Sequence, residues 1–187
     1  ITYDINDVGK SDLVIFHARD IRRYVTLKEI QQIHKYRSPQ QRMAFFNRES
    51  IVNDQGLKNL FPWPEGFFNW TITFKRESDF HFPYGHYAPL PSAERPAKIP
   101  DYAAVKNKSV LWAVSSCGKT RDKYVKKLLK YIKVDVYGHC AGKFGQDNQC
   151  RLSSNCDDIF STYKFYLAFE NSVCPDYITE KFWRTLG

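Results

Sequence analysis

A strand, a helix and a second strand follow one another within residues 109–138, and no other stretch constrains the fold as strongly. Ser109–Ser115 and Val134–Gly138 are apolar runs of strand length. The segment between them, residues 121–132, has the apolar spacing of a helix. Its expected buried side is Tyr124, Val125, Leu128 and Ile132. A connection of this length makes the two strands parallel and the crossover right-handed, so the sequence predicts an α/β fold.

The first half of the chain has the same alternation of strands and helices. Ser11–His17 predicts a buried strand, and Thr26 is the expected N-cap of a helix with the sequence LKEIQQIHKYR. A short apolar strand, Met43–Phe46, then runs toward the carboxylate of Glu49, and Phe67–Phe74 has the aromatic and β-branched composition of another strand.

A proline-rich segment separates the two halves. Ala88–Pro100 contains Pro89, Pro91, Pro96 and Pro100 and shows no apolar periodicity, which is typical of a linker. We therefore place the boundary near residue 105, with an N-terminal domain at 1–105 and a C-terminal domain at 106–187.

The charge balance is basic, with 28 Lys and Arg against 20 Asp and Glu and a net charge of +8. Such an excess is found in proteins that bind nucleic acids, anionic membranes or phosphorylated ligands. Part of it is a solvated helix face formed by Lys123, Lys126, Lys127 and Lys130. Most aromatic residues lie in strand-like runs instead of alternating with Lys and Arg, so we expect no nucleic-acid partner.

Five cysteines lie in the second half of the chain, and none forms a C-x-x-C pair typical of zinc. The sequons at Asn69 and Asn107 are glycosylation sites if the chain is secretory. Both features favour an oxidising compartment. We expect one disulfide among Cys140, Cys150 and Cys156 to staple the loop at residues 139–158. The odd count implies a free thiol or a partner outside this segment, and Cys174 could pair with Cys117 or with a cysteine beyond Gly187. We predict no metal site.

The stretch from Tyr163 to Leu186 concentrates polar groups behind an apolar run. Phe165–Phe169 is expected to be a central strand ending at Glu170, Asn171 and Ser172, at the edge where parallel sheets bind ligands. A helix is expected to start with Asp176 as N-cap, and its N-terminus beside Lys181 suits a phosphate. One helix face would carry Tyr177, Glu180, Lys181 and Arg184. An amphipathic helix whose Glu and Lys are merely solvated fits the same spacing equally well.

Several of these segments resemble the α1,3/α1,4-fucosyltransferase family. The run FYLAFENS followed by DYITEK resembles its donor-binding signature, and Glu49-Ser50, with the aromatic Phe46 three positions before Glu49, resembles the setting of its general base. The block from NWT to the Pro-Tyr-Gly turn at residues 83–85 and the strand–helix–strand region match as well. The chain departs from the family at Ile51, where many members have Pro, at Glu77, where Asp is commoner, and at Ser116, where Asn is usual.

The resemblance implies a GT-B fold of two Rossmann-like domains, the second truncated here, and transfer of fucose from GDP-fucose with inversion. It implies that Glu49 is the catalytic base. The donor-binding residues would be Arg121, Glu170, Asn171, Tyr177, Glu180 and Lys181. The residues that shape the cleft between domains would be Arg76, Ser78, Asp79 and Tyr84. No cofactor is required, and because the sequence contains no Asp-x-Asp triplet, Lys and Arg are expected to hold the diphosphate without a metal.

The resemblance leaves the acceptor open between the innermost GlcNAc of an N-glycan and an outer lactosamine. It implies a lumenal catalytic domain in the Golgi membrane, held by an N-terminal anchor absent from this chain, and only weak activity for the chain in isolation. The alternative is a catalytically weak or silent relative that binds nucleotide sugars or glycans and would tolerate loss of Glu49, or an inactive fragment.

Overall fold

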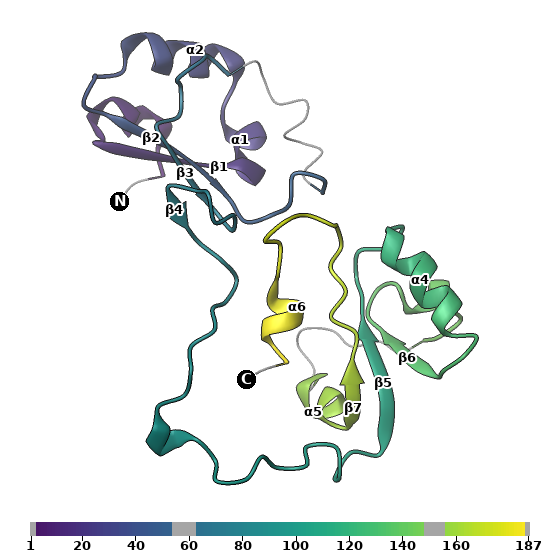
Figure 1. Cartoon of the computed structure of the whole chain (residues 1–187). Coiled ribbons are helices and arrows are strands. Elements are labelled where there is room, and N and C mark those ends of the chain that lie inside the picture. The colour runs from purple at the N-terminus through teal and green to yellow at the C-terminus, as the bar shows by residue number, and fades with distance from the viewer. Residues whose placement is uncertain (1–2, 54–62, 148–155, 186–187) are drawn as a thin grey trace. The chain divides into compact units, whose positions relative to one another are not determined.

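The structure is a computed structural model that describes residues 3–53, 63–147 and 156–185. The chain forms two compact units. Unit 1 comprises Ile1–Tyr84 and Val173–Thr179, and unit 2 comprises Gly85–Ser172 and Glu180–Gly187. Each unit has its own parallel β-sheet, and Figure 1 shows the elements of both. The α/β class with parallel sheets is therefore confirmed.

The sheet of unit 1 has the strand order β1-β2-β3-β4, and every neighbouring pair is parallel. The strands are β1 (Leu13–His17), β2 (Arg42–Asn47), β3 (Trp70–Thr73) and β4 (Phe80–His81). In a parallel sheet the carboxyl ends of all strands meet at one edge. The residues that follow β2 and β3, among them Glu49, are therefore brought to the same edge.

The helices of unit 1 are η1 (Ile5–Lys10), α1 (Ala18–Tyr24) and α2 (Leu27–Tyr36). Thr26 caps α2 as predicted: its hydroxyl accepts the backbone N–H of Glu29 at 3.3 Å, and the Glu29 carboxylate accepts the backbone N–H of Thr26 at 2.7 Å. The core of the unit is formed by Phe16, Ile21, Ile30, Met43 and Phe67.

Two features of unit 1 differ from the sequence prediction. Helix α1 was not predicted, because its sequence, ARDIRRY, has one branched aliphatic residue, Ile21, and no repeating apolar pattern. Strand β1 is only half-buried, since it lies at the sheet edge and leaves Leu13 43% and Ile15 53% exposed.

Unit 2 contains a sheet of the order β6-β5-β7, again with parallel pairs. The strands are β5 (Lys108–Ala113), β6 (Val134–Tyr137) and β7 (Tyr163–Tyr166). The helical segments are η2 (Ser92–Glu94), α4 (Thr120–Leu128), η3 (Ala141–Phe144), α5 (Cys156–Ser161) and α6 (Glu180–Trp183). The core contains Val110, Trp112, Val114, Val125, Val134, Val136, Cys140 and Ala141. The predicted parallel strand–helix–strand unit is thus confirmed.

Helix α4 is shorter than its apolar pattern predicted. It ends at Leu128, and the chain turns at once, with the N–H groups of Tyr131 and Ile132 both donating to the carbonyl of Leu128. Tyr124 and Ile132 are consequently 58% and 43% exposed, so their predicted burial is wrong. The predicted lysine face of α4 is exposed.

Strand β7 and the segment after it differ from the sequence prediction. Strand β7 ends at Tyr166 instead of Phe169, and in the described part of the sheet it lies at an edge and not in the centre. Asp176 is not a helix N-cap: its φ of 61° is left-handed. The helix begins only at Glu180 and has 4 residues, so it offers no extended N-terminus for a phosphate, and Tyr177 precedes it.

The disulfide pattern also differs from the prediction. Cys117 is bonded to Cys140, which ties the loop after β5 to the loop after β6. Cys140 therefore does not staple its own loop, and Cys174 does not pair with Cys117. Cys156 is also disulfide-bonded, and Cys150, the remaining cysteine of the predicted staple, lies outside the described residues, so a staple without Cys140 stays a prediction. Among the residues that the structure describes, Cys174 has a free thiol.

The proline-rich segment is exposed from residue 86 to residue 105 and contains only the short η2. Contacts group it with unit 2. Within the described residues, no helix has both the length and the apolar character that a membrane span needs.

Candidate functional site

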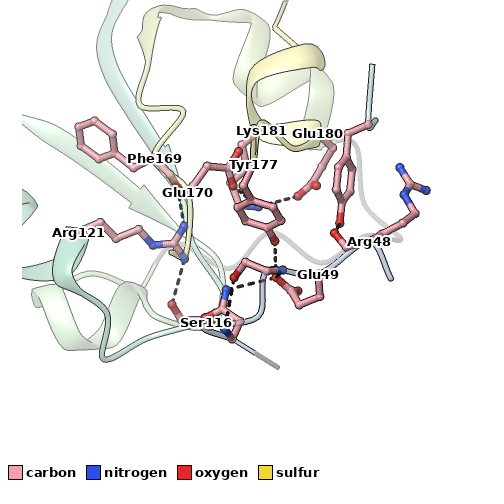
Figure 2. Close-up of polar contacts among 12 residues, drawn as sticks. Arg48, Glu49, Ser116, Arg121, Phe169, Glu170, Tyr177, Glu180 and Lys181 are labelled. Atoms are coloured by element: carbon pink, nitrogen blue, oxygen red, sulfur yellow. Dashed lines mark hydrogen bonds and ion pairs between the residues drawn. The ribbon is translucent and has the colours of Figure 1, made fainter. Parts of the chain in front are cut away.

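The Glu49 carboxylate lies just beyond the carboxyl end of β2 and is fixed through one of its oxygens. Oε1 accepts hydrogen bonds from the backbone N–H of Ser50 at 3.1 Å, from Nδ2 of Asn53 at 3.2 Å and from the hydroxyl of Tyr177. The Asn47 side chain accepts the N–H of Glu49 at 2.9 Å and holds the turn. Oε2 accepts no hydrogen bond from the described residues, so one carboxylate oxygen is oriented and open (Figure 2).

Tyr177 reaches Glu49 because the segment Val173–Thr179 packs within unit 1. The residue is 5% exposed, and its ring lies edge-on against Phe74, with centroids 5.0 Å apart, and against Tyr84 at 6.2 Å. The Asp176 carboxylate fixes the preceding turn, since it accepts the backbone N–H of Arg76 at 3.3 Å. Tyr177 therefore contacts the candidate base, a relationship that its predicted place on a helix with Lys181 did not reveal.

The four residues predicted to shape a cleft all hold turns of unit 1. Arg76 pairs with Asp176, with 3.5 Å between Nε and Oδ1, and its side chain is 83% exposed. The hydroxyl of Tyr84 donates to the carbonyl of Arg48 at 2.9 Å. Ser78 bonds to the Thr73 hydroxyl, and Asp79 accepts the backbone N–H of Thr71 at 2.7 Å. Their role in a cleft stays a prediction.

The hydrogen bonds to Asp79 also affect its ionisation. The backbone N–H of Thr71 and then its hydroxyl hold the pKa of Asp79 below its ordinary value. Thr71 belongs to the sequon of Asn69, whose Oδ1 accepts the N–H of Met43 at 2.9 Å. Both Asn69 and Asn107 are exposed, and their glycosylation stays a prediction.

Arg121 is 8% exposed and joins two loops of unit 2. Its Nη1 donates to the carbonyl of Phe169 at 2.5 Å, and its Nη2 donates to the carbonyl of Ser116 at 3.0 Å (Figure 2). The guanidinium thus fastens the chain after β7 to the loop after β5. A contact of Arg121 with a diphosphate stays a prediction.

The loop beside Arg121 offers fewer donors than the sequence indicated. The backbone N–H of Gly118 donates to Asp122 Oδ2 at 2.6 Å, so it is not available to a ligand. Asp122 is 8% exposed, and its Oδ1 is buried without a hydrogen bond in the described part of the chain. This contact of Asp122 was not predicted. A carboxylate within one helical turn of a Gly-containing loop is a sequence signal for a hydrogen bond to a loop N–H, and it could have indicated the contact.

Lys181 lies between two carboxylates of unit 2. Its Nζ is 3.4 Å from Glu170 Oε2 and 2.9 Å from Glu180 Oε1, and the Lys181 and Glu170 side chains are only 20% and 16% exposed. Oδ1 of Asn171, next to Glu170, is buried without a hydrogen bond among the described residues. A partly buried cation, two carboxylates and an amide oxygen are thus gathered after β7.

The ionisation of Tyr166 shows that charged groups surround the end of β7. Burial raises the pKa of its hydroxyl, and the carboxylates of Glu180 and Glu170 raise it further, whereas Arg184 and Arg121 lower it. The charges of two carboxylates and two guanidinium groups therefore act on the Tyr166 hydroxyl.

The predicted site residues are divided between the two units. Unit 2 brings together Arg121, Glu170, Asn171, Glu180 and Lys181, while Glu49 and Tyr177 meet in unit 1.

Two family models match the chain. The model described as "Fucosyltransferase, N-terminal" matches residues 1–85, and the one described as "Glycosyltransferase family 10 (fucosyltransferase) C-term" matches residues 103–187. The chain belongs to the family 10 fucosyltransferases. In these family 10 matches Glu49 falls in the N-terminal region, and Arg121, Glu170 and Lys181 fall in the C-terminal one.

Similar proteins carry fucosyltransferase names. The gibbon (Hylobates lar) 4-galactosyl-N-acetylglucosaminide 3-alpha-L-fucosyltransferase FUT5 is 38% identical over 98% of this chain and 46% of its own length. The cattle (Bos taurus) 3-galactosyl-N-acetylglucosaminide 4-alpha-L-fucosyltransferase FUT3 is 36% identical over 98% of this chain and 47% of its own. The mouse (Mus musculus) alpha-(1,3)-fucosyltransferase 7 is 34% identical over 95% and 41%. The chain thus spans less than half the length of these relatives.

No group of three or more His, Cys, Asp or Glu side chains among the described residues is arranged to hold a metal ion.

Proposed function

We propose that the protein transfers fucose from GDP-fucose to the 3-hydroxyl of a GlcNAc residue in a glycoprotein glycan, with inversion, and that Glu49 is the general base. The observation that carries this proposal is the hydrogen bonding of the two oxygens of the Glu49 carboxylate. Oε1 is held by Ser50, Asn53 and Tyr177, while Oε2 accepts no hydrogen bond from the described residues. A fixed carboxylate with one open oxygen is suited to take a proton from a hydroxyl.

In the proposed reaction the acceptor oxygen bonds to C1 of fucose while the bond from C1 to the diphosphate oxygen breaks. The acceptor proton passes to Glu49 Oε2, and GDP leaves with the bonding electron pair. Because attack comes from the face opposite GDP, the anomeric configuration inverts. Tyr177 and the neighbouring N–H groups keep the carboxylate aimed at the hydroxyl, which is a positioning contribution.

We propose that the donor binds unit 2 around the end of β7. Lys181 and Arg121 supply positive charge toward the leaving diphosphate, and the carboxylates of Glu170 and Glu180 accept hydrogen bonds from sugar hydroxyls. The buried Oδ1 of Asn171 provides a further acceptor for a ligand donor. Tyr177 stays a candidate for donor contact as well, although its hydroxyl already donates to Glu49.

The proposal includes a GT-B arrangement of two Rossmann-like domains, at 1–105 and 106–187, with Arg76, Ser78, Asp79 and Tyr84 at the cleft. It takes no metal and no cofactor, and it places the catalytic domain in the Golgi lumen on a membrane anchor. The name of the gibbon relative favours an outer lactosamine as acceptor, since it gives a 4-galactosyl-N-acetylglucosaminide as the substrate of a 3-fucosyltransferase.

Product analysis tests this function directly. The complete protein would be incubated with GDP-fucose and N-acetyllactosamine, and the product examined by mass spectrometry and by NMR of the new linkage. We expect one added fucose, on the GlcNAc 3-hydroxyl, with an anomeric configuration opposite to that of the donor. Retention of configuration, or binding of GDP-fucose without any transfer, would overturn the proposal.

A further inference from the structure

Arg48, the residue before the candidate base, is held in an unusual way. Its guanidinium carbon lies 4.2 Å from the centroid of the Tyr84 ring and 5.1 Å from that of Phe82. Its backbone carbonyl accepts the Tyr84 hydroxyl at 2.9 Å, so the same tyrosine fixes both ends of the residue. Figure 2 shows the Arg48 side chain extending away from the Glu49 carboxylate. Two aromatic faces thus hold the cation in place.

The N–H groups of Arg48 are not used by the described residues. Its Nε is buried without a hydrogen bond, and none of the carboxylates in this part of the chain lies within ion-pair distance. Arg37 is a useful contrast in the same unit. It lies 5.9 Å from the Phe67 ring, but its two terminal nitrogens donate to the carbonyls of Phe67 and Gly66. The guanidinium donors of Arg37 are therefore used within the fold. The guanidinium of Arg48 is held in place by the rings, but its N–H groups make no hydrogen bond with the described residues.

The chemistry of this fork selects a class of ligand. A guanidinium presents parallel N–H donors that match the two oxygens of a carboxylate or of a sulfate, and it accepts no hydrogen bond. Stacking between rings lowers the hydration of the cation and the entropy lost on binding, and both effects favour an anion. A neutral hydroxyl gains less from such a group, because no charge is neutralised.

We propose that Arg48 binds an acidic group, a carboxylate or a sulfate ester, on the acceptor saccharide. This inference rests on the proposed function, because Glu49 next to it would take the proton of the reacting hydroxyl. The acidic group lies on a sugar other than the one that reacts, since the two side chains extend in different directions (Figure 2). Arg48 is then a residue that determines acceptor specificity.

The test compares acceptors that differ only in charge. Values of kcat/KM would be measured on the complete protein with N-acetyllactosamine, its 3′-sialylated form and its 3′-sulfated form. The variants are R48Q, which removes the charge and the fork, and R48K, which keeps the charge alone. K35Q is the matched control: it removes a cation that lies 5.0 Å from the Tyr36 ring on the exposed face of α2.

We expect the wild-type protein to prefer at least one acidic acceptor, and R48Q to lower the ratio of acidic to neutral kcat/KM by about tenfold or more, mainly through KM. R48K should keep part of the ratio, and K35Q should leave it unchanged. The sialylated and sulfated arms show which anion is preferred. The inference would be overturned if the wild type showed no preference for an acidic acceptor. It would also be overturned if R48Q lowered kcat/KM equally for all three acceptors, since Arg48 would then act only by holding Tyr84 in place.

The inference and the proposed function fail in different ways. If the wild-type protein transfers fucose to none of the acceptors, the proposed function fails. Saturation-transfer NMR of the sialylated and sulfated acceptors then still tests Arg48, because the signal should weaken in R48Q but not in K35Q. If transfer occurs and only the acidic preference is missing, the proposed function stands without the inference.

Discussion

The hydroxyl of Tyr177 donates a hydrogen bond to the carboxylate of Glu49, although the two residues are 128 positions apart in the sequence. The contact joins the family's predicted base to a residue expected to bind the donor. It also explains why Tyr177 is buried at 5% exposure against Phe74 and Tyr84. A variant that removes only the hydroxyl can separate the two roles.

Replacing Tyr177 with Phe keeps the ring packing and removes the hydrogen bond to Glu49. We expect kcat to fall by about tenfold, the order of one charge-assisted hydrogen bond, with the Kd of GDP-fucose unchanged. Steady-state kinetics and calorimetric titration with GDP-fucose measure the two quantities. A weakened Kd at normal kcat would instead assign Tyr177 to donor binding.

The left-handed backbone of Asp176, with φ of 61°, predicts an unequal response to two substitutions. Asn tolerates this conformation and keeps an oxygen for the Arg76 N–H, so Asp176→Asn should change the free energy of unfolding little. Asp176→Ala should destabilise by about 1–2 kcal/mol, because a Cβ without a local hydrogen bond is unfavourable there. Urea unfolding measures both, and equal effects of the two changes would contradict the structural reason.

The capping box of α2 predicts a pH-dependent effect. Thr26→Ala removes a hydroxyl that bonds to Glu29, and it should cost about 1 kcal/mol near neutral pH. The backbone N–H and the hydroxyl of Thr26 hold the pKa of Glu29 below its ordinary value of 4.5, so the contribution of the carboxylate is present above pH 4.5 and is lost as the pH falls through the lower folded-state pKa.

Urea unfolding of Thr26→Ala and wild type at neutral and at acidic pH measures this trend. The destabilisation by Thr26→Ala should shrink on acidification, provided the wild type remains folded there. A difference between the two proteins that grows toward acid would contradict the capping role of Glu29.

The Cys117–Cys140 disulfide closes a loop with a sequence separation of 23. Replacing both cysteines, as Cys117→Ser with Cys140→Ala, should lower the free energy of unfolding by about 3 kcal/mol, mostly by loosening the unfolded chain. Cys174→Ser is the matched control and should have little effect, since Cys174 has a free thiol in the described structure. Peptide mapping without reduction would find Cys117 linked to Cys140, and a link from Cys117 to Cys174 would contradict the structure.

The elements that the sequence predicted are those with strong local signals. The strand–helix–strand unit repeats apolar residues at fixed spacing, and Val110, Val125 and Val136 are buried as that spacing requires. The cap at Thr26 depends on residues within one helical turn. The placement of Glu49 beyond β2 follows from an apolar run that stops at a carboxylate.

The elements that the sequence missed depend on contacts between distant segments. Glu49, the partner of Tyr177, lies in the first half of the chain. The sequence around Tyr177 is typical of the start of a helix, so it did not predict this contact. The pairing of Cys117 with Cys140 is one of several that the cysteine spacing allows. Arg48 carried no signal, since its role depends on Phe82 and Tyr84, which follow only after β3 and β4.

The central claim is that Glu49 takes the acceptor proton, and the Glu49→Gln variant tests it most directly. Gln keeps the shape of the side chain and cannot act as base at neutral pH. We predict that kcat falls by about 10²-fold or more while the Kd of GDP-fucose is unchanged, and that the exposed control Glu65→Gln behaves as wild type. Turnover of Glu49→Gln within about twofold of wild type would contradict the account.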